Sequence, residues 1–193
     1  MPKIVDKDQK RRNIAKSTCN LFIEKGFVNI SISQIAQVAG IGKGTVYEYF
    51  KNKEDIIFEL MGCMLEEYDQ KLTSNLASTD DVKQKVIYLF DIFFNTDNER
   101  VKIQRTIFKE FLAILLNNPN QELYDFHQNL INKYILIMND MINKAIEDNK
   151  LIPLSLDMVP TIFATMEGFF ISQTSKKDMT KYIDNIFRLL EVK

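Results

Sequence analysis

The sequence predicts an all-α protein made of a small N-terminal head and a larger helical body. Glycine and proline are scarce, with 6 and 4 in 193 residues, which disfavours sheets and disorder. Hydrophobic residues make up 46% of the chain and recur at helical spacing along most of it. Residues 26–55 contain two short helical patterns separated by a tight turn. We therefore expect a three-helix head over residues 1–52 and a body over residues 53–193.

The head reads as three helices in order. The first is expected to end at Lys25, because Gly26 can adopt the left-handed conformation that closes a helix. The next begins at Ser31, where a Ser-x-x-Gln pattern matches a capping box. Gly40 interrupts its apolar pattern, and the third helix starts near Lys43. Two short helices joined in this way have the form of a helix-turn-helix, whose second helix enters the major groove of DNA.

This segment also resembles a known family. The run IAQVAGIGKGTVYEYFKNKEDI, residues 35–56, is similar to the DNA-binding signature of the tetracycline-repressor (TetR-type) family of bacterial transcription regulators. One departure is Gly42, which stands where relatives often have a serine-like cap. The resemblance implies a homodimeric repressor on a palindromic operator, released when a small effector binds in the body.

Charge is distributed unevenly along the chain. Residues 1–53 hold ten lysines and arginines against four acids, a net charge of +6, which leaves −7 for the rest because the whole chain carries −1. A basic segment neutralises phosphates and releases their counterions, whereas the acidic remainder repels DNA. The segment from Lys3 to Arg12 either follows the DNA backbone into a minor groove or is a solvated terminus.

The DNA contacts are expected on the second helix of the motif and its flanks. Lys43 and Tyr47 are suited to base edges, and Gly44 permits close backbone approach. Val46 and Phe50 are assigned to the core. The resemblance implies further contacts with the DNA backbone, from residues whose hydroxyl or ammonium groups can bind phosphates. The predicted DNA-binding residues are Ser31, Ser33, Lys43, Gly44, Thr45, Tyr47, Tyr49 and Lys53.

Beyond Asn52, which can cap the next helix, the body reads as a succession of amphipathic helices. Apolar stripes predict helices over residues 56–72, 82–93, 107–115, 123–145, 156–174 and 179–191. Turn-forming residues predict breaks at 117–120 and 149–153.

The last two of these helices have more apolar surface than one small body needs. In the resembling family such a pair forms a four-helix dimer interface, and Gly168 suits a close helix crossing. Packing inside a single subunit is the alternative. The predicted interface residues are Ile162, Met166, Phe169, Phe170, Ile183 and Phe187.

Phenylalanine and methionine are abundant in the body, which suggests a pocket for an apolar or amphipathic effector, although such stripes also form ordinary cores. The predicted pocket residues are Met61, Met64, Tyr68, Phe90, Phe93, Phe108, Glu110, Phe111, Phe163 and Glu167. The two glutamates lie in apolar runs, where a buried carboxylate needs a positive partner, and a cationic group on a largely apolar effector would meet that need. A fatty acid or acyl thioester would instead need Arg105 or Lys109.

Other function classes are disfavoured. The chain has one histidine, His127, and has no Cys-x-x-Cys, phosphate-binding glycine loop or nucleophile elbow, so we expect no enzyme, metal or cofactor. Cys19 and Cys63 lie at apolar positions typical of buried thiols. No signal peptide or membrane span is visible, which predicts a cytoplasmic protein. The alternative is a helical module that binds another protein or an acyl carrier, with an architectural DNA-binding head.

Overall fold

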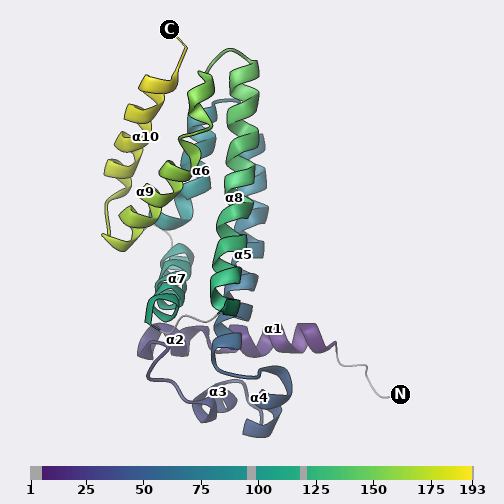
Figure 1. Ribbon diagram of the computed structural model, residues 1–193. Coiled ribbons are helices and arrows are strands. Elements are labelled where there is room, and N and C mark those ends of the chain that lie inside the picture. The colour runs from purple at the N-terminus through teal and green to yellow at the C-terminus, as the bar shows by residue number, and fades with distance from the viewer. Residues whose placement is uncertain (1–5, 95–98, 118–120, 193) are drawn as a thin grey trace. The chain divides into compact units, whose positions relative to one another are not determined.

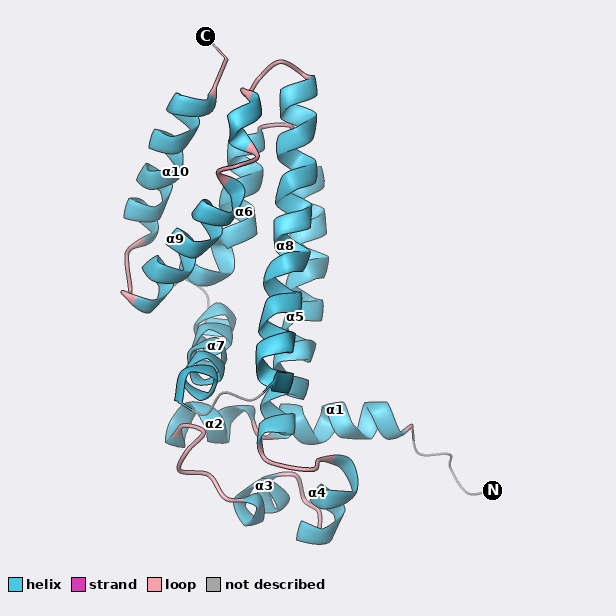
Figure 2. Cartoon of the chain, in the orientation of Figure 1, coloured by secondary structure: helices cyan, strands magenta, loops and turns pink. Residues whose placement is uncertain are grey.

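The computed structural model describes residues 6–94, 99–117 and 121–192. Every regular element in these ranges is a helix (Figure 2), and an isolated antiparallel β-bridge joins Leu151 to Glu191. The all-α prediction is confirmed. The predicted break at 118–120 and the start of the basic segment at Lys3 lie outside the described residues. Within the described part of the chain, no helix is both long enough and apolar enough to cross a membrane.

The helices follow one another as labelled in Figure 1. They are α1 (Lys7–Ser17), α2 (Cys19–Lys25), α3 (Ile32–Val38), α4 (Lys43–Tyr49), α5 (Glu54–Ala77), α6 (Val82–Phe94), α7 (Glu99–Asn117), α8 (Gln121–Glu147), a 3-10 turn (Pro153–Ser155), α9 (Val159–Ile171) and α10 (Lys176–Leu190). The single helix that was expected to end at Lys25 is therefore two helices, α1 and α2. They divide at Thr18, a buried residue whose hydroxyl donates to the carbonyl of Ala15 at 2.6 Å and so competes with the regular backbone ladder.

The described residues fall into two compact units. The first comprises residues Met1–Asp69 and Lys102–Asn117, and the second comprises Gln70–Val101 and Asn118–Lys193. Both α5 and α7 therefore supply residues to each unit. The unit that holds the helix-turn-helix extends past residue 52 and includes most of α7. The division at residue 52 concerned which residues bind DNA, and it stays a prediction.

The first unit is built on a core of apolar residues from each of its helices. Phe22 and Phe27 stack with their ring centroids 5.9 Å apart, which closes the end of α2 as expected for a helix followed by Gly26. The core side chains include Ile14, Phe22, Ile35, Val46, Phe50, Ile56, Ile57, Met61, Phe108 and Phe111.

In the second unit, α6 packs against α8, α9 and α10, and α8 also packs against α9. Two ion pairs join α6 to α10: Lys83 binds Asp184 at 3.0 Å, and Lys176 binds Asp91 at 2.8 Å. The predicted dimer residues need correction here. Five of the six are buried inside the protomer, because the apolar stripes of α9 and α10 cover α6 and α8; they are Ile162, Met166, Phe170, Ile183 and Phe187.

Candidate DNA-binding site and effector region

The helix-turn-helix is formed by α3, a tight turn and α4. The predicted capping box is confirmed, with the Ser31 amide donating to the Gln34 side chain at 2.9 Å and the Gln34 amide donating to the Ser31 hydroxyl at 3.3 Å. Gly40 has a φ of 65°, which favours glycine and lets the chain reverse direction. The Ile41 amide then donates to the carbonyl of Ala36 at 3.0 Å. These local bonds fix α4 against α3.

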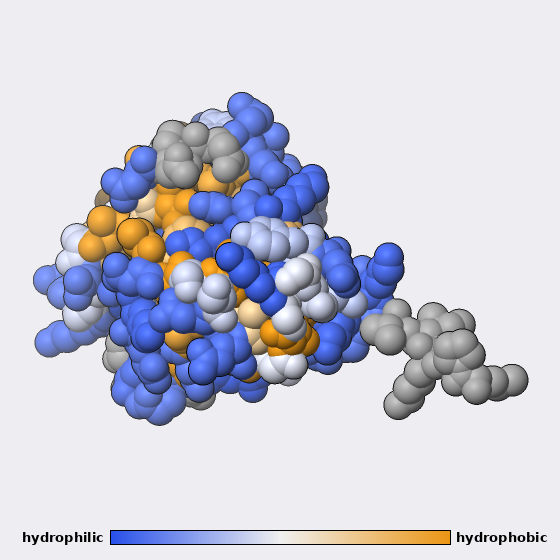
Figure 3. Space-filling model, turned by 90° about the horizontal axis from the view of Figure 1, so that it is seen from below, coloured by the Kyte–Doolittle hydropathy of each residue, from blue (hydrophilic) through white to orange (hydrophobic). Residues whose placement is uncertain are grey.

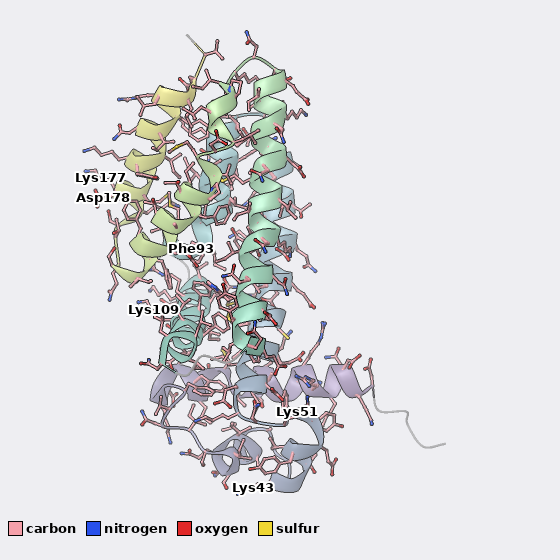
Figure 4. The ribbon with its side chains drawn as sticks, viewed as in Figure 1. Lys43, Lys51, Phe93, Lys109, Lys177 and Asp178 are labelled. Atoms are coloured by element: carbon pink, nitrogen blue, oxygen red, sulfur yellow. The ribbon has the colours of Figure 1, made fainter. Side chains whose placement is uncertain are left out.

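The helix α4 has two distinct faces. Val46 is fully buried and Phe50, just after the helix, is 2% exposed, as predicted for core residues. On the other side Lys43, Gly44 and Tyr47 are exposed, and the Tyr47 side chain is 53% exposed. A Cβ atom added at Gly44 would meet no atom within 4 Å, so this face is open. Figure 4 shows Lys43 at the outer edge of the head.

The remaining hydroxyl residues of the predicted site differ in their exposure to solvent. Ser31 and Ser33 are exposed at the start of α3, although the Ser31 hydroxyl already caps that helix. Thr45 and Tyr49 are half-buried on α4. Figure 3, which shows the molecule from below, reveals a mainly hydrophilic face with separate clusters of hydrophobic residues. The motif thus presents polar and aromatic groups together.

Lys53 has a role that the sequence did not indicate. Its ammonium donates to the carbonyls of Phe27 at 2.7 Å and Ile30 at 3.0 Å, with Val28 at 3.4 Å, and lies 4.3 Å from the centroid of the Phe27 ring. The ammonium therefore holds the loop between α2 and α3. That Lys53 also attracts phosphates stays a prediction, and its ammonium already has hydrogen-bond acceptors within the head.

The two arginines of α1 also have protein partners. Arg12 binds both carboxylate oxygens of Glu66, at 2.7 and 2.8 Å, and this hydrogen bonding raises the pKa of the arginine. Arg11 donates to Glu59 at 2.6 Å and to the carbonyl of Tyr49 at 3.0 Å. Sequence spacing gave no signal of these pairs, because α1 and α5 are far apart along the chain. The basic charge of α1 is therefore partly neutralised.

Glu110 of α7, a predicted pocket residue, lies in the first unit. Its carboxylate accepts a hydrogen bond from the amide of Phe27 at 2.7 Å, beside Gly26, whose φ is 70°. A Cβ atom at Gly26 would lie 3.5 Å from a carboxylate oxygen of Glu110. The role of Glu110 in an effector pocket stays a prediction, and its carboxylate already accepts a hydrogen bond from a backbone amide of the head.

The other pocket residues form one cluster in each unit. In the first unit, Phe111 contacts both Phe58 and Phe108 with ring centroids 6.2 Å apart, and the buried side chains of Met61, Met64 and Tyr68 also belong to this unit. In the second unit the members are aromatic rings of α6 and α9: Phe90 lies 4.9 Å from Phe163, and Phe93 lies 5.3 Å from Phe170.

A polar pair accompanies the second cluster. Glu167 is on α9 between Phe163 and Phe170, and its carboxylate lies 3.1 Å from Nε2 of His127 on α8. The histidine is buried, whereas the Glu167 side chain is 26% exposed, so the pair is only partly removed from solvent. His127 was expected to be an ordinary packed or surface histidine, and the structure gives it a carboxylate partner. On α9, Glu167 lies at helical spacing from both Phe163 and Phe170, which are members of the aromatic cluster.

A surface pocket of about 490 Å³ is present elsewhere in the second unit. It lies between the start of α6 and the end of α8 and contains none of the predicted effector residues. Its lining residues are Asp80, Val82, Lys85, Asp140, Met141, Lys144, Ala145, Asp148 and Lys150.

The described residues include no group of three or more metal-ligating side chains. Burial raises the pKa of the Cys19 thiol and of the Cys63 thiol, which keeps both protonated at neutral pH.

Comparison with known proteins also points to the helix-turn-helix. The profile of the family described as bacterial regulatory proteins, tetR family, matches residues 14–60, which contain the whole helix-turn-helix. A helix-turn-helix-type transcriptional regulator of Staphylococcus aureus (strain USA300) is 30% identical over 129 residues, 65% of this chain and 69% of that protein. The fatty acid metabolism regulator protein of Bacillus subtilis (strain 168) is 23% identical over 149 residues, 75% of this chain and 72% of that protein.

A shorter match links the chain to the transcriptional regulator HbdR of Aromatoleum sp. (strain CIB), which is 35% identical over 71 residues, 37% of this chain and 30% of HbdR. Among solved structures, a TetR-family regulator from Cytophaga hutchinsonii has the same fold, with a TM-score of 0.81 over 99% of each chain at 16% identity. Two of these sequence relatives are named as helix-turn-helix-type transcriptional regulators, a class of DNA-binding proteins and not of enzymes, and the third is named as a regulator of fatty acid metabolism.

Proposed function

This chain belongs to the TetR family of bacterial DNA-binding transcriptional regulators, and we propose that it is a cytoplasmic repressor that binds a palindromic operator as a homodimer. A small, largely apolar effector bound in the body releases the DNA. The observation that supports this proposal most strongly is the open face of α4. Lys43, Gly44 and Tyr47 are exposed there while Val46 anchors the opposite face in the core. An exposed helix face with donors and an aromatic ring suits base-edge contacts in a major groove.

The homodimer is supported by the faces of α9 and α10 that the protomer leaves uncovered. On α9, Ala164, Gly168 and Ile171 follow helical spacing and are exposed, with Ile171 62% exposed. On α10, Ile186 is half-buried and Leu189 is 74% exposed. A Cβ atom at Gly168 would meet no atom within 4 Å, so a partner helix could approach closely there.

We propose that these exposed residues of α9 and α10 form the dimer interface, in place of the five predicted residues that are buried within the protomer. Of the original six, Phe169 is half-buried and remains available, with its ring 5.4 Å from that of Tyr182. A dimer is needed because a helix-turn-helix protein reads two half-sites about one DNA turn apart.

The aromatic cluster of the second unit supports an apolar effector with a positive charge. Phe90, Phe93 and Phe163 supply aromatic rings, and Glu167, one helical turn after Phe163 on α9, supplies a carboxylate that pairs with His127. Aromatic faces and a carboxylate both attract a desolvated cation.

An acyl effector is the second candidate, because a relative is named for fatty acid metabolism. Arg105 on α7 would be its anchor. This arginine is half-buried, and burial lowers its pKa.

Release requires that the effector bind the DNA-incompetent arrangement better than the competent one. The bond between Glu110 and the Phe27 amide gives α7 a direct hold on the loop that leads into α3. A shift of α7 would therefore move the loop before α3 and, with it, the helix-turn-helix.

A gel-shift assay tests the proposal, using the duplex directly upstream of the protein's own gene and an unrelated duplex of equal length. We expect the wild-type protein to shift the first at concentrations at least about a hundredfold lower than the second. Equal affinity for both duplexes would contradict a sequence-specific repressor and favour the protein- or acyl-carrier-binding alternative.

A further inference from the structure

Arg11 on α1 makes three contacts, one with α5 and two at the C-terminal end of α4. Its Nε donates to the Glu59 carboxylate on α5 at 2.6 Å, and one terminal nitrogen donates to the carbonyl of Tyr49 at 3.0 Å. The guanidinium carbon lies 4.8 Å from the centroid of the Phe50 ring. A planar guanidinium that bonds in two directions and stacks on a ring has little freedom to turn. Arg11 thus joins α1, α4 and α5.

The carbonyl that Arg11 binds is one that the helix cannot satisfy by itself. Tyr49 is the last residue of α4, and the final carbonyls of a helix have no partner within it. A cation at this end is also favoured by the helix dipole. Phe50 follows in an extended conformation, with φ −135° and ψ 127°, and its side chain is buried. The C-terminal end of α4 is therefore fixed by both Arg11 and the core.

The other end of α4 is held less firmly. Its N-cap is Gly42, which offers no side-chain hydrogen bond. The helix has seven residues, too few to be stable without tertiary contacts. Lys43 and Gly44 lie in the first turn at this less restrained end, and Tyr47 lies about one turn further along the helix. The direction in which they point consequently depends on how the C-terminal end is anchored.

We propose that Arg11 is a positioning residue for α4 that sets the angle at which Lys43 and Tyr47 meet the bases. It acts through the Tyr49 carbonyl and the Phe50 ring, and it is not a phosphate contact of the basic N-terminal segment. This inference rests on the proposed DNA-binding function.

Arg12 provides a matched control on the same helix. It has a side-chain exposure of 41% against 35% for Arg11, and it binds Glu66 on α5 through two hydrogen bonds. Replacement of either arginine by glutamine removes the same charge from α1. The two differ in that Arg11 bonds to the end of α4.

The experiment compares Arg11→Gln, Arg11→Lys and Arg12→Gln with the wild type, at a temperature where circular dichroism shows all four folded. The probes are an operator duplex selected from random DNA by the wild-type protein and an unrelated duplex of the same length. Binding to both is measured by fluorescence anisotropy over a range of salt concentrations. Hydrogen exchange of residues 43–50 is measured on the same proteins without DNA.

We expect Arg11→Gln and Arg11→Lys to weaken operator binding about tenfold or more, while binding to the unrelated duplex and the salt slope are unchanged. Lysine keeps the charge but lacks the planar guanidinium, so Arg11→Lys should not restore operator binding. Exchange in residues 43–50 should rise in both Arg11 variants. Arg12→Gln should change neither operator preference nor this exchange.

A phosphate contact would behave differently. Arg11→Gln would weaken both duplexes alike and lower the salt slope by about 0.9, and Arg11→Lys would restore binding. Either result overturns the proposal. If the wild type selects no operator, the proposed function fails, and the exchange data then decide alone: faster exchange of residues 43–50 in the Arg11 variants supports the positioning role, and unchanged exchange overturns it.

Discussion

The carboxylate of Glu110 accepts a hydrogen bond from the backbone amide of Phe27, with 2.7 Å between the nitrogen and Oε2. The bond joins α7 to the loop that precedes the helix-turn-helix. On the opposite side of the same residue, the carbonyl of Phe27 accepts a hydrogen bond from Lys53 at 2.7 Å. One peptide segment is thus held by two charged side chains, Glu110 from α7 and Lys53 from the segment just before α5, and charge-assisted hydrogen bonds of this kind are stronger than neutral ones.

We expect Glu110→Ala to lower the free energy of unfolding by about 1–3 kcal/mol, because it leaves the Phe27 amide without its partner. Glu110→Gln should have a smaller effect, since its amide oxygen still accepts the bond. Urea unfolding gives the energies, and hydrogen exchange of the Phe27 amide reports the bond itself. Exchange that is equally slow in the wild type and in Glu110→Ala would show that this bond does not hold the loop.

Lys53→Met should lower the free energy of unfolding by about 1.5–3 kcal/mol, because backbone carbonyls lose a charged donor. Lys51→Met is the control, since Lys51 is exposed (Figure 4) and its replacement should cost less than about 0.5 kcal/mol. Equal effects of the two changes in urea unfolding would contradict the structural role of Lys53. If the salt slope for operator binding falls by about one unit in Lys53→Met, Lys53 also contacts a DNA phosphate.

Tyr47→Ala should reduce the preference for operator over unrelated DNA by about 1–3 kcal/mol, because it removes a side chain from the open face of α4. Tyr124→Ala on α8 is a matched control, since both tyrosines are 53% exposed. Competition binding with operator and unrelated duplexes measures the preference. A folded Tyr47→Ala protein with wild-type discrimination would mean that α4 is not the reading helix.

Leu189→Glu should convert the homodimer to monomers and weaken operator binding strongly, because the charge would be buried at the proposed seam. Leu136→Glu should leave the dimer intact, although Leu136 on α8 is similarly exposed, at 63% against 74%. Sedimentation equilibrium distinguishes the two states. A dimer that survives Leu189→Glu would exclude this part of α10 from the interface.

The effector prediction uses two probes of similar shape and opposite charge, tetraphenylphosphonium and tetraphenylborate. Glu167→Gln should weaken binding of the cation about tenfold and spare the anion, because the carboxylate is carried by α9 one turn after Phe163 of the aromatic cluster. Glu110→Gln should spare both, since that carboxylate serves the Phe27 amide. Thermal shift titrations measure binding. Stronger binding of the anion by the wild type would favour an acyl effector instead.

The sequence by itself determined the features that depend on near neighbours in the chain. Ser31 and the residue three positions later form a capping box, Gly40 takes a positive φ, and Asn52 accepts the Asp55 amide at 2.7 Å at the start of α5. Such contacts span only a few residues, and the helical period fixes them as soon as the helix forms. The same reasoning correctly placed Val46 and Phe50 in the core.

Only the tertiary structure decided the partners of the charged groups and the direction of the apolar faces. Glu110 and Phe27 are 83 positions apart, and Arg11 and Glu59 are 48 apart, so no local spacing could pair them. Helical periodicity showed that α9 has an apolar stripe, yet it could not show whether that stripe covers its own protomer or a partner. The packing of α6 and α8 buries Met166 and leaves Ile171 exposed, because burial depends on which helices meet and not on the sequence of one helix.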